Sequence, residues 1–464
     1  MSIVDMVIRN GKIFTPYGLL KAGLAIDEGR IVSIAKDPRL PKADRVIDAR
    51  GKLIIPGGID AHVHIYTGEK YRYREDFENG SKAALAGGTT MVIDFVGFAG
   101  DPKKEFEEKK EIGEKESSID FSLHADILNE KSINDIPMLA EKGVSSFKHI
   151  MANCDGPEYI MPDGLILESF KKVGEVGGIA SVHAENEEIR AYLVKKLKDS
   201  GRNDPLAHAE SRPRICEDEA VSRAIIFAKE AGVHLHVFHL SSGNAVNFIK
   251  WAKSEGYRIT CETCPHYLLF TQDDLKRLGP YLQVNPSLKH KSDREALWKA
   301  LAEGSIDIVT SDHYAPLRSE KEKGWENIWE VEAGVPGVET RLMLLMSEGV
   351  NRGRISLKRF VDALCTLPAK IFGFYPKKGI IHVGSDADIV IIDHEKEFKI
   401  SADKLHHRAD WTPYEGIKVK GIPILTIVKG KVMMEDGEVW GDPGYGSFIG
   451  RKSKKQTCPD IKSL

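Results

Sequence analysis

Short apolar runs alternate with longer amphipathic segments through most of this 464-residue chain. Eight of these runs have the length and the β-branched content of buried strands: 52–64, 89–95, 118–126, 144–151, 178–185, 233–240, 257–263 and 305–312. Segments such as 74–87 and 294–304 carry apolar residues at three-to-four spacing, which predicts helices with one buried face. Eight strands that alternate with helices predict an α/β fold, the (β/α)8 TIM barrel.

The two ends of the chain show a different pattern, with short strands joined by tight turns. The turns are predicted where glycine follows a residue able to adopt positive φ, at Asn10-Gly11, Glu28-Gly29, Arg50-Gly51, Lys429-Gly430 and Asp436-Gly437. We expect a small antiparallel unit at the N-terminus, a similar unit near the C-terminus, and one composite β-sandwich domain made from both. The predicted domains are residues 1–54 and 376–464 for this β-sandwich, including a C-terminal tail, and residues 55–375 for the barrel.

The balance of charges disfavours nucleic acid or a membrane as a partner. The 66 Lys and Arg residues nearly equal the 69 Asp and Glu residues, and the formal net charge is −3 without any long block of one sign. No apolar run is long enough to span a bilayer, and Asp5 and Arg9 interrupt the region where a signal peptide would be apolar. Six cysteines, most of them widely scattered, fit a reducing compartment. These features predict a cytoplasmic protein that acts on a small molecule.

Polar side chains suited to metal ions stand at the ends of the predicted strands, where barrel enzymes carry their reacting groups. The first strand ends in His62 and His64, which alternate with Val63 and therefore point to the same side. The other candidates are Lys148 in SSFKHIMA, His183 in SVHAEN, His239 in FHLSS and Asp312 in TSDHYAP. One such histidine would be an ordinary core residue, whereas four histidines and an aspartate at matching depths predict a site for Zn²⁺ or a similar ion.

Lys148 does not fit a metal site as a protonated amine, because an ammonium group is repelled by divalent ions and cannot coordinate them. One interpretation is a lysine whose buried stem carries its charge to the barrel mouth. The other is that CO₂ adds to the amine and gives a carbamate able to bridge two metals. The charges favour the second interpretation, because carbamate, Asp312 and one hydroxide offset most of the charge of two divalent ions.

Other histidines and cysteines need to be separated from this group. His234 and His236 lie at the start of their strand, with the opposite alternation to His239, and we interpret them as structural. Cys261, Cys264 and His266, in the block CETCPH, could form half of a zinc site, but no second pair follows at a suitable spacing. Packing at the end of the strand is therefore the favoured interpretation of this pair.

Several blocks of the sequence together resemble one enzyme family. The blocks are PGGIDAHVH, EDFENGSKAALAGGTTMVIDF, SFKHIMA, VHAEN, HLSS, ETCPHYL, TSDH and GVPGVETRL. In this order they resemble the cyclic amidohydrolases of the amidohydrolase superfamily, which comprise hydantoinases and dihydropyrimidinases with allantoinase and dihydroorotase as relatives. The resemblance extends over nearly the whole chain and leans towards hydantoinases.

This resemblance implies two divalent metal ions, Zn²⁺ with Mn²⁺ or Co²⁺ as alternatives. His62, His64, Lys148 and Asp312 would hold one ion, and Lys148, as the CO₂-derived carbamate, would hold the other with two further ligands, His183 and His239. A bridging hydroxide would attack a ring amide, and Asp312 would pass its proton to the leaving nitrogen. The resemblance also implies that Asn285 contacts the ring amide of the substrate through its backbone groups, and that the protein is a homodimer or homotetramer.

Three positions depart from the family's pattern and bear on the substrate. Tyr66 stands where dihydroorotases carry an arginine, which disfavours dihydroorotate. Asn153 and Ala333 stand where D-selective hydantoinases carry tyrosine and asparagine, so the ring substituent and its handedness stay open. Hydantoinase is the leading hypothesis, with allantoinase and dihydropyrimidinase as alternatives, and an apolar pocket around Tyr66, Phe95 and residues 153–165 would favour a hydantoin.

Two further alternatives carry less weight. A non-catalytic scaffold relative would have lost metal ligands, whereas competent residues fill all six ligand positions here. A mononuclear deaminase of the same superfamily would lack the lysine that Lys148 provides.

Overall fold

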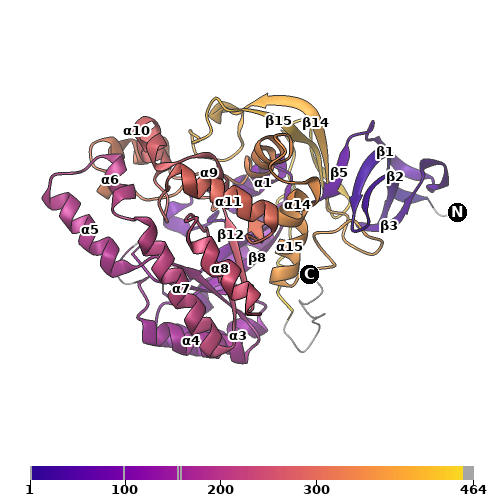
Figure 1. The fold of residues 1–464 in the computed structure, drawn as a ribbon. Helices are drawn as coiled ribbons and strands as arrows, with labels where there is room; N and C mark the ends of the chain where they lie inside the picture. The colour runs from indigo at the N-terminus through magenta and orange to yellow at the C-terminus, as the bar shows by residue number, and fades with distance from the viewer. Residues whose placement is uncertain (1–2, 98–99, 154–155, 157–158, 453–464) are drawn as a thin grey trace.

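The barrel and a β domain lie side by side in the computed structural model, which describes residues 3–97, 100–153, 156 and 159–452 (Figure 1). The barrel strands are β6 (Gly58–Asp60), β7 (Thr89–Val96), β8 (Asp120–Asp126), β9 (Phe147–Ile150), β10 (Ile179–His183), β11 (His234–Val237), β12 (Ile259–Thr263) and β13 (Ile308–Val309). They pair in parallel in chain order. Within the described residues, no helix is long and apolar enough to cross a membrane.

The barrel closes where its first strand meets its last. Val63 and His313 form an isolated parallel β-bridge, and the backbone N–H of His64 donates to the backbone carbonyl oxygen of His313 at 2.7 Å. Arg341 is fully buried beside this seam, where its guanidinium donates to the carbonyls of Ile59 at 3.0 Å and Val309 at 2.8 Å. The eight predicted strands and the TIM barrel are therefore confirmed.

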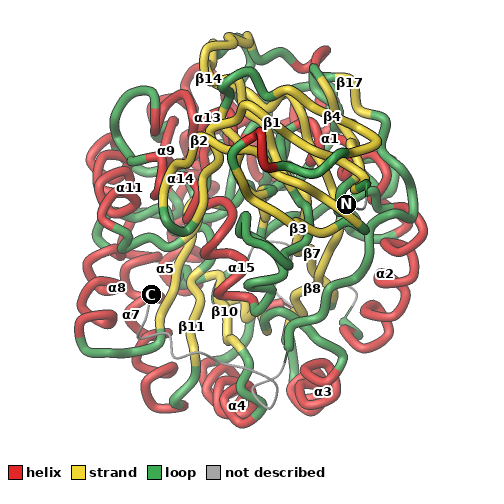
Figure 2. The backbone as a smooth tube through the Cα atoms, turned by 90° about the vertical axis from the view of Figure 1, so that its right-hand side faces the viewer, coloured by secondary structure: helices red, strands yellow, loops and turns green. Residues whose placement is uncertain are grey.

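Helices cover the outside of the barrel (Figures 1 and 2). They are α1 (Phe77–Ala86), α2 (Pro102–Glu116), α3 (Glu130–Glu141), α4 (Asp163–Glu175), α5 (Glu187–Asp199), α6 (Pro205–Glu210), α7 (Arg214–Ala231), α8 (Ala245–Ser254), α9 (Pro265–Leu269), α10 (Leu275–Leu278), α11 (Lys291–Glu303), α12 (Arg318–Glu322), α13 (Arg341–Leu345), α14 (Leu357–Val361) and α15 (Leu367–Phe372). Polar side chains cap the starts of several of these helices. Asp76 caps α1 by accepting from the Asn79 backbone N–H, and Asn186 caps α5 in the same way.

Both ends of the chain contribute strands to the β domain, as predicted. Its strands are β1 (Val4–Thr15), β2 (Gly18–Asp27), β3 (Arg30–Ala35), β4 (Ala43–Asp48), β5 (Leu53–Pro56), β14 (Ile389–Lys399), β15 (Lys418–Val428), β16 (Lys431–Glu435) and β17 (Glu438–Val439). They form one nine-stranded sheet in which β5 pairs antiparallel with β14. Ile8 and Ile54 from one end share a core with Ile391 and Ile427 from the other.

All five residues before glycine have positive φ, and four of the five predicted turns are confirmed because each joins two strands, as Glu28-Gly29 joins β2 to β3 and Lys429-Gly430 joins β15 to β16. The prediction at Asn10-Gly11 was wrong, because β1 continues through these residues and only its pairing register shifts. The shift is a β-bulge, because three steps along β1, from Ile8 to Gly11, face two steps along β2, from Leu24 to Ala22. The Asn10 carbonyl accepts from the Gly51 backbone N–H at 2.6 Å. The N-terminal unit is also not purely antiparallel, because β4 and β5 pair in parallel with β1.

The run predicted as the first barrel strand is divided between the two domains. Gly57 separates β5, which belongs to the β domain, from β6, which belongs to the barrel. A Cβ atom at Gly57 would lie 2.1 Å from the Thr90 Oγ1, so glycine allows the chain to pass against β7 at this point. Near the other end, the Ile449 N–H donates to the Phe121 carbonyl at 2.7 Å, so the C-terminal stretch returns to the barrel.

A buried ion cluster joins the barrel to the β domain. The Lys378 ammonium, with its side chain 1% exposed, lies 2.5 Å from Asp120, 2.9 Å from Asp386 and 2.6 Å from Asp388. Asp120 begins β8, whereas Asp388 directly precedes β14. Lys429 also contacts Asp120, at 2.9 Å. The three carboxylates could hold a metal by their spacing, but Lys378 and Lys429 already offset most of their charge.

We predict that Lys378→Met destabilises the protein by about 3–5 kcal/mol, because three buried carboxylates lose their shared cation. Chemical denaturation followed by tryptophan fluorescence would measure this. Lys377→Met is the matched control, since its side chain is 51% exposed and 3.8 Å from Asp386. Equal losses in the two variants would contradict the structural role of the cluster.

Candidate active site

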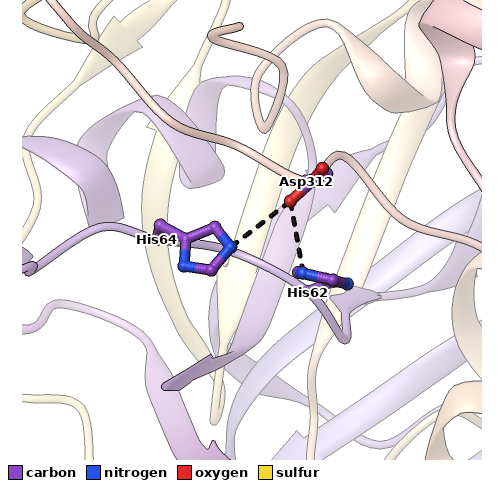
Figure 3. A group of neighbouring side chains, drawn as sticks. All are labelled: His62, His64 and Asp312. Atoms are coloured by element: carbon purple, nitrogen blue, oxygen red, sulfur yellow. Dashed lines mark ion pairs between the residues drawn. The ribbon is translucent and has the colours of Figure 1, made fainter. Parts of the chain in front are cut away.

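Two histidines and an aspartate meet across the seam of the barrel. Figure 3 shows His62 and His64, which follow β6, pointing at the carboxylate of Asp312, which follows β13. Their Nε2 atoms lie 3.2 Å and 3.3 Å from the same Asp312 oxygen. Asp312 has a φ of 49°, a strained conformation for a residue with a side chain. This spacing suits three ligands of one metal ion.

The remaining predicted ligands lie on the neighbouring strands β9 (Lys148) and β10 (His183) and just after β11 (His239). The His183 Nδ1 is 3.1 Å from the His239 Nε2. His239, like Asp312, has a positive φ, at 35°. The Lys148 ammonium lies 4.2 Å from the centre of the Phe95 ring. The structure therefore brings all six predicted ligand residues to one end of the barrel, where five of them line a single cavity: His64, Lys148, His183, His239 and Asp312.

Glu262 orients the first of these histidines, and the sequence analysis missed it. Its carboxylate contacts the His62 Nδ1 at 2.6 Å and the His236 Nε2 at 3.2 Å, and it accepts from the His239 backbone N–H at 3.2 Å. A proton on the His62 Nδ1 leaves Nε2 free to bind a metal. Glu262 stands in the CETCPH block, whose sequence pattern points only to the cysteines and His266 as candidate ligands.

Glu185 orients His183 in the same way that Glu262 orients His62. Its carboxylate contacts the His183 Nε2 at 3.0 Å and also pairs with Arg212. Arg212 in turn donates to the Asn153 carbonyl at 2.7 Å. Burial alone would raise the pKa of Glu185, but the Arg212 charge lowers it. The histidine pair is therefore connected through one arginine to the segment that follows β9.

Burial favours the neutral form of three of the site histidines, His62, His183 and His239. Burial lowers the pKa of His62 and of His239 well below the usual range, and it also lowers the pKa of His183. Burial alone would raise the pKa of Asp312, but His62 and His64 together bring it well below its ordinary value. Neutral imidazoles and an ionised carboxylate are the forms that coordinate metal ions.

Two buried nitrogens support this interpretation. The His62 Nε2 faces the Asp312 oxygen but makes no hydrogen bond to it, and neither it nor the His239 Nδ1 has a hydrogen-bond partner within the described part of the chain. Buried polar atoms without partners are rare in folded proteins and call for an explanation. Metal coordination supplies one, because the donor set is made of imidazole and carboxylate without thiolates.

A cavity of about 820 Å³ opens onto these residues. Aromatic side chains form much of its wall: Tyr66, Tyr71, Phe95, Tyr159, Tyr314 and Trp329. Asn285 and Asn153 also line it. The Asn285 Oδ1 is buried and has no hydrogen-bond partner among the residues that the structure describes.

The comparisons with known proteins agree with this geometry. Residues 53–433 match the model of the amidohydrolase family. The chain belongs to the amidohydrolase family. It is 37% identical to the L-hydantoinase of Paenarthrobacter aurescens over 97% of this chain and 98% of the relative. It is 38% identical to the D-hydantoinase of Ralstonia pickettii over 98% of this chain and 100% of the relative.

Solved structures of amidohydrolases have the same fold. An L-hydantoinase (dihydropyrimidinase) from Arthrobacter aurescens superposes with a TM-score of 0.93 at 36% identity, over 97% of this chain and all of that one. A D-hydantoinase (dihydropyrimidinase) from Thermus sp. gives a TM-score of 0.91 at 34% identity, over 96% of this chain and 99% of that one. The resemblance to cyclic amidohydrolases is therefore confirmed.

The residues set aside in the sequence analysis have other partners in this amidohydrolase. His234 and His236 both contact the Thr260 hydroxyl, at 2.9 Å and 2.8 Å. Cys261 and Cys264 are buried free thiols, and they belong to no group of possible metal ligands among the described residues. Two further cysteines, Cys154 and Cys458, lie outside the described residues.

Behind the histidine pair, Glu217 accepts from the backbone N–H of Ser241 at 2.7 Å and from its hydroxyl. Burial raises the pKa of Glu217 from 4.5 to about 7. The folded protein therefore binds this proton more tightly than the unfolded chain does. The stability that this proton supplies is present at low pH and is lost as the pH rises towards 7.

We predict that Glu217→Gln, which cannot ionise, gains about 3 kcal/mol relative to the wild type between pH 4.5 and pH 7. Denaturant unfolding at several pH values would measure the difference. Glu230→Gln, an exposed residue of the same helix α7, is the control. A difference that stays constant with pH would show that Glu217 ionises normally.

Proposed function

We propose that this cyclic amidohydrolase is a hydantoinase, which opens 5-substituted hydantoins to N-carbamoyl amino acids with two metal ions. The observation that carries the proposal is the gathering of four histidines, a lysine and an aspartate at one end of the barrel, beside a large cavity. Relatives named L-hydantoinase and D-hydantoinase match nearly the full chain.

The residues divide into two ligand sets. His62, His64 and Asp312 would hold one divalent ion, and His183 and His239 the other, with Lys148 as N6-carboxylysine between them. Zn²⁺, Mn²⁺ and Co²⁺ all suit imidazole and carboxylate donors. Carboxylation would convert the only cation of the group into an anion, which removes the conflict between Lys148 and the metals.

When bound, the two ions supply a water acidified near neutral pH and polarise the ring carbonyl. Asp312, which lines the cavity beside both seam histidines, would accept a proton during the attack and donate it to the leaving ring nitrogen. Glu262 and Glu185 hold the imidazoles in one orientation. Asn285 lines the cavity, and its backbone groups would contact the ring amide.

The cavity wall favours a neutral ring with an apolar substituent. Tyr66, Phe95 and Trp329 supply an aromatic surface. Among the described lining residues the lysines are Lys109 and Lys148. Lys109 is already paired with Asp94 at 3.0 Å, and Lys148 would carry a negative charge once carboxylated. A carboxylate on the ring, as in dihydroorotate, would therefore find no available cation.

Allantoinase is the second candidate, because polar groups also line the cavity. Asn153, Asp126 and Glu105 are among them and could bind a ureido group.

We also propose, from the composition and the buried free cysteines, that the protein is cytoplasmic. From the family resemblance we propose that it is a homodimer or homotetramer.

The test is a substrate panel: L- and D-5-substituted hydantoins, dihydrouracil, allantoin and dihydroorotate, with protein loaded with Zn²⁺ or Mn²⁺ and bicarbonate. We predict ring opening of a hydantoin, and its loss in Lys148→Ala together with loss of bound metal. A fully metallated protein that opens none of these rings would refute the proposal. Turnover of allantoin alone would support the second candidate.

We also predict that Glu262→Gln weakens metal binding by about 10–100-fold, because His62 loses the carboxylate that orients it. Competition with a chelator, read out by metal analysis, measures this without reference to activity. Glu255→Gln, an exposed position after α8, is the control. Unchanged metal affinity in Glu262→Gln would refute the orienting role.

A further inference from the structure

Arg74 lies where two loops of the barrel mouth meet. It belongs to residues 61–76, which connect β6 to α1, and its side chain is 8% exposed. Its guanidinium donates to Glu320 at 2.6 Å and 3.0 Å and to Glu332 at 2.5 Å. Both glutamates belong to the segment between β13 and α13. One cation therefore joins the loops that follow the first and the last strand of the barrel.

The partners of Arg74 are also part of the cavity wall. Tyr314 and Glu332 both line the cavity; the Tyr314 hydroxyl accepts from Arg74 and donates to Glu332. Tyr71, another lining residue, has its ring centre 4.6 Å from the guanidinium. We call these five residues, Tyr71, Arg74, Tyr314, Glu320 and Glu332, the mouth clasp.

Arg74 keeps its positive charge within the mouth clasp. Burial alone would lower the pKa of Arg74, but its hydrogen bonds to Glu320 and Glu332 raise it. An arginine can bond to two carboxylates and a phenol at once, because its donors point in fixed directions. A lysine offers one point charge and cannot reproduce this arrangement.

The wall behind the clasp has little room to shift. Lys321 is fully buried and donates to the carbonyls of Glu332 at 2.9 Å and Gly334 at 3.3 Å. A Cβ atom at Gly334 would lie 2.5 Å from the Tyr314 ring. The lining residues that follow Glu332 are thus held by Lys321 on one side and by Tyr314 on the other, and Tyr314 is itself held by Arg74.

An ordinary surface ion pair would have a different setting. Arg318 and Asp410, also at the mouth, are 48% and 60% exposed, and they are 3.8 Å apart. Pairs of this kind contribute little to stability or to shape. Arg74 is buried, bonds to two carboxylates and contacts three lining residues, so it fixes the position of the wall.

We infer that Arg74 is a positioning residue that determines substrate specificity, by fixing the wall that receives the ring substituent. The inference rests on the proposed hydantoinase function. The hydantoin ring itself would bind at the metal ligands, so removing the clasp should affect large substituents and leave the smallest substrate nearly unchanged.

The experiment compares Arg74→Gln, Arg74→Lys and the wild type on unsubstituted hydantoin and on L- and D-5-benzylhydantoin. We expect Arg74→Gln to raise KM for the preferred benzyl enantiomer about tenfold and to reduce the enantiomer preference, with kcat and KM for hydantoin within about twofold. Arg74→Lys should fall between the two. Arg223→Gln is the matched control, since Arg223 bridges Asp163 and Glu219 on the outer helices at 2.5 Å and 3.1 Å.

Hydrogen–deuterium exchange tests the same inference without catalysis. Arg74→Gln should speed exchange in both 65–76 and 313–335 and leave the barrel strands unchanged. Equal losses on all three substrates, or unchanged exchange in both loops, would overturn the inference while the hydantoinase proposal stands. A wild type that opens no hydantoin would refute the proposed function and the specificity role with it.

Discussion

The seam between the first and last barrel strands is the constraint on which the site depends. His62 and His64 are separated from Asp312 by about half of the sequence, and only closure of the barrel brings them together. The Val63–His313 bridge and the Arg341 guanidinium, which reaches carbonyls on both β6 and β13, hold this closure. The backbone that closes the barrel therefore also sets the distance between the candidate metal ligands.

Burial then determines the chemistry of the residues gathered at the seam. Removal from water keeps the imidazoles neutral, while the nearby histidines keep Asp312 ionised. Buried carboxylates behind the site, Glu262 and Glu185, hold the rings. Arg212 and Arg74 extend the same network outwards to the residues that line the cavity. Metal ligands and cavity wall are thus parts of one connected structure.

Much of this arrangement follows from local patterns in the sequence. The barrel strands are short buried runs, and the candidate ligands stand at their ends, so position in the chain predicts position in space. The Glu28, Arg50, Lys429 and Asp436 turns are local as well. The Asn10 bulge could not be predicted, because it depends on the register in which β1 pairs with β2. The division of the first strand at Gly57 depends in the same way on a contact with Thr90.

The supporting residues are the part that the sequence does not reveal. Glu262 is separated from His62 by 200 residues, and Arg74 from Glu320 by 246. Nothing near either residue in the chain indicates its partner, since each contact exists only after the barrel has closed. The ligand residues carry a recognisable pattern of types and spacing, whereas the residues that orient them are single charges in ordinary segments.

The most direct test of the central claim is a crystal structure of the bicarbonate-treated, metal-loaded protein, with anomalous scattering recorded at the metal edge. The account predicts two anomalous peaks, one among His62, His64 and Asp312 and one between His183 and His239, with added density on Lys148 between them. A single peak, or peaks away from these residues with an unmodified Lys148, would contradict it.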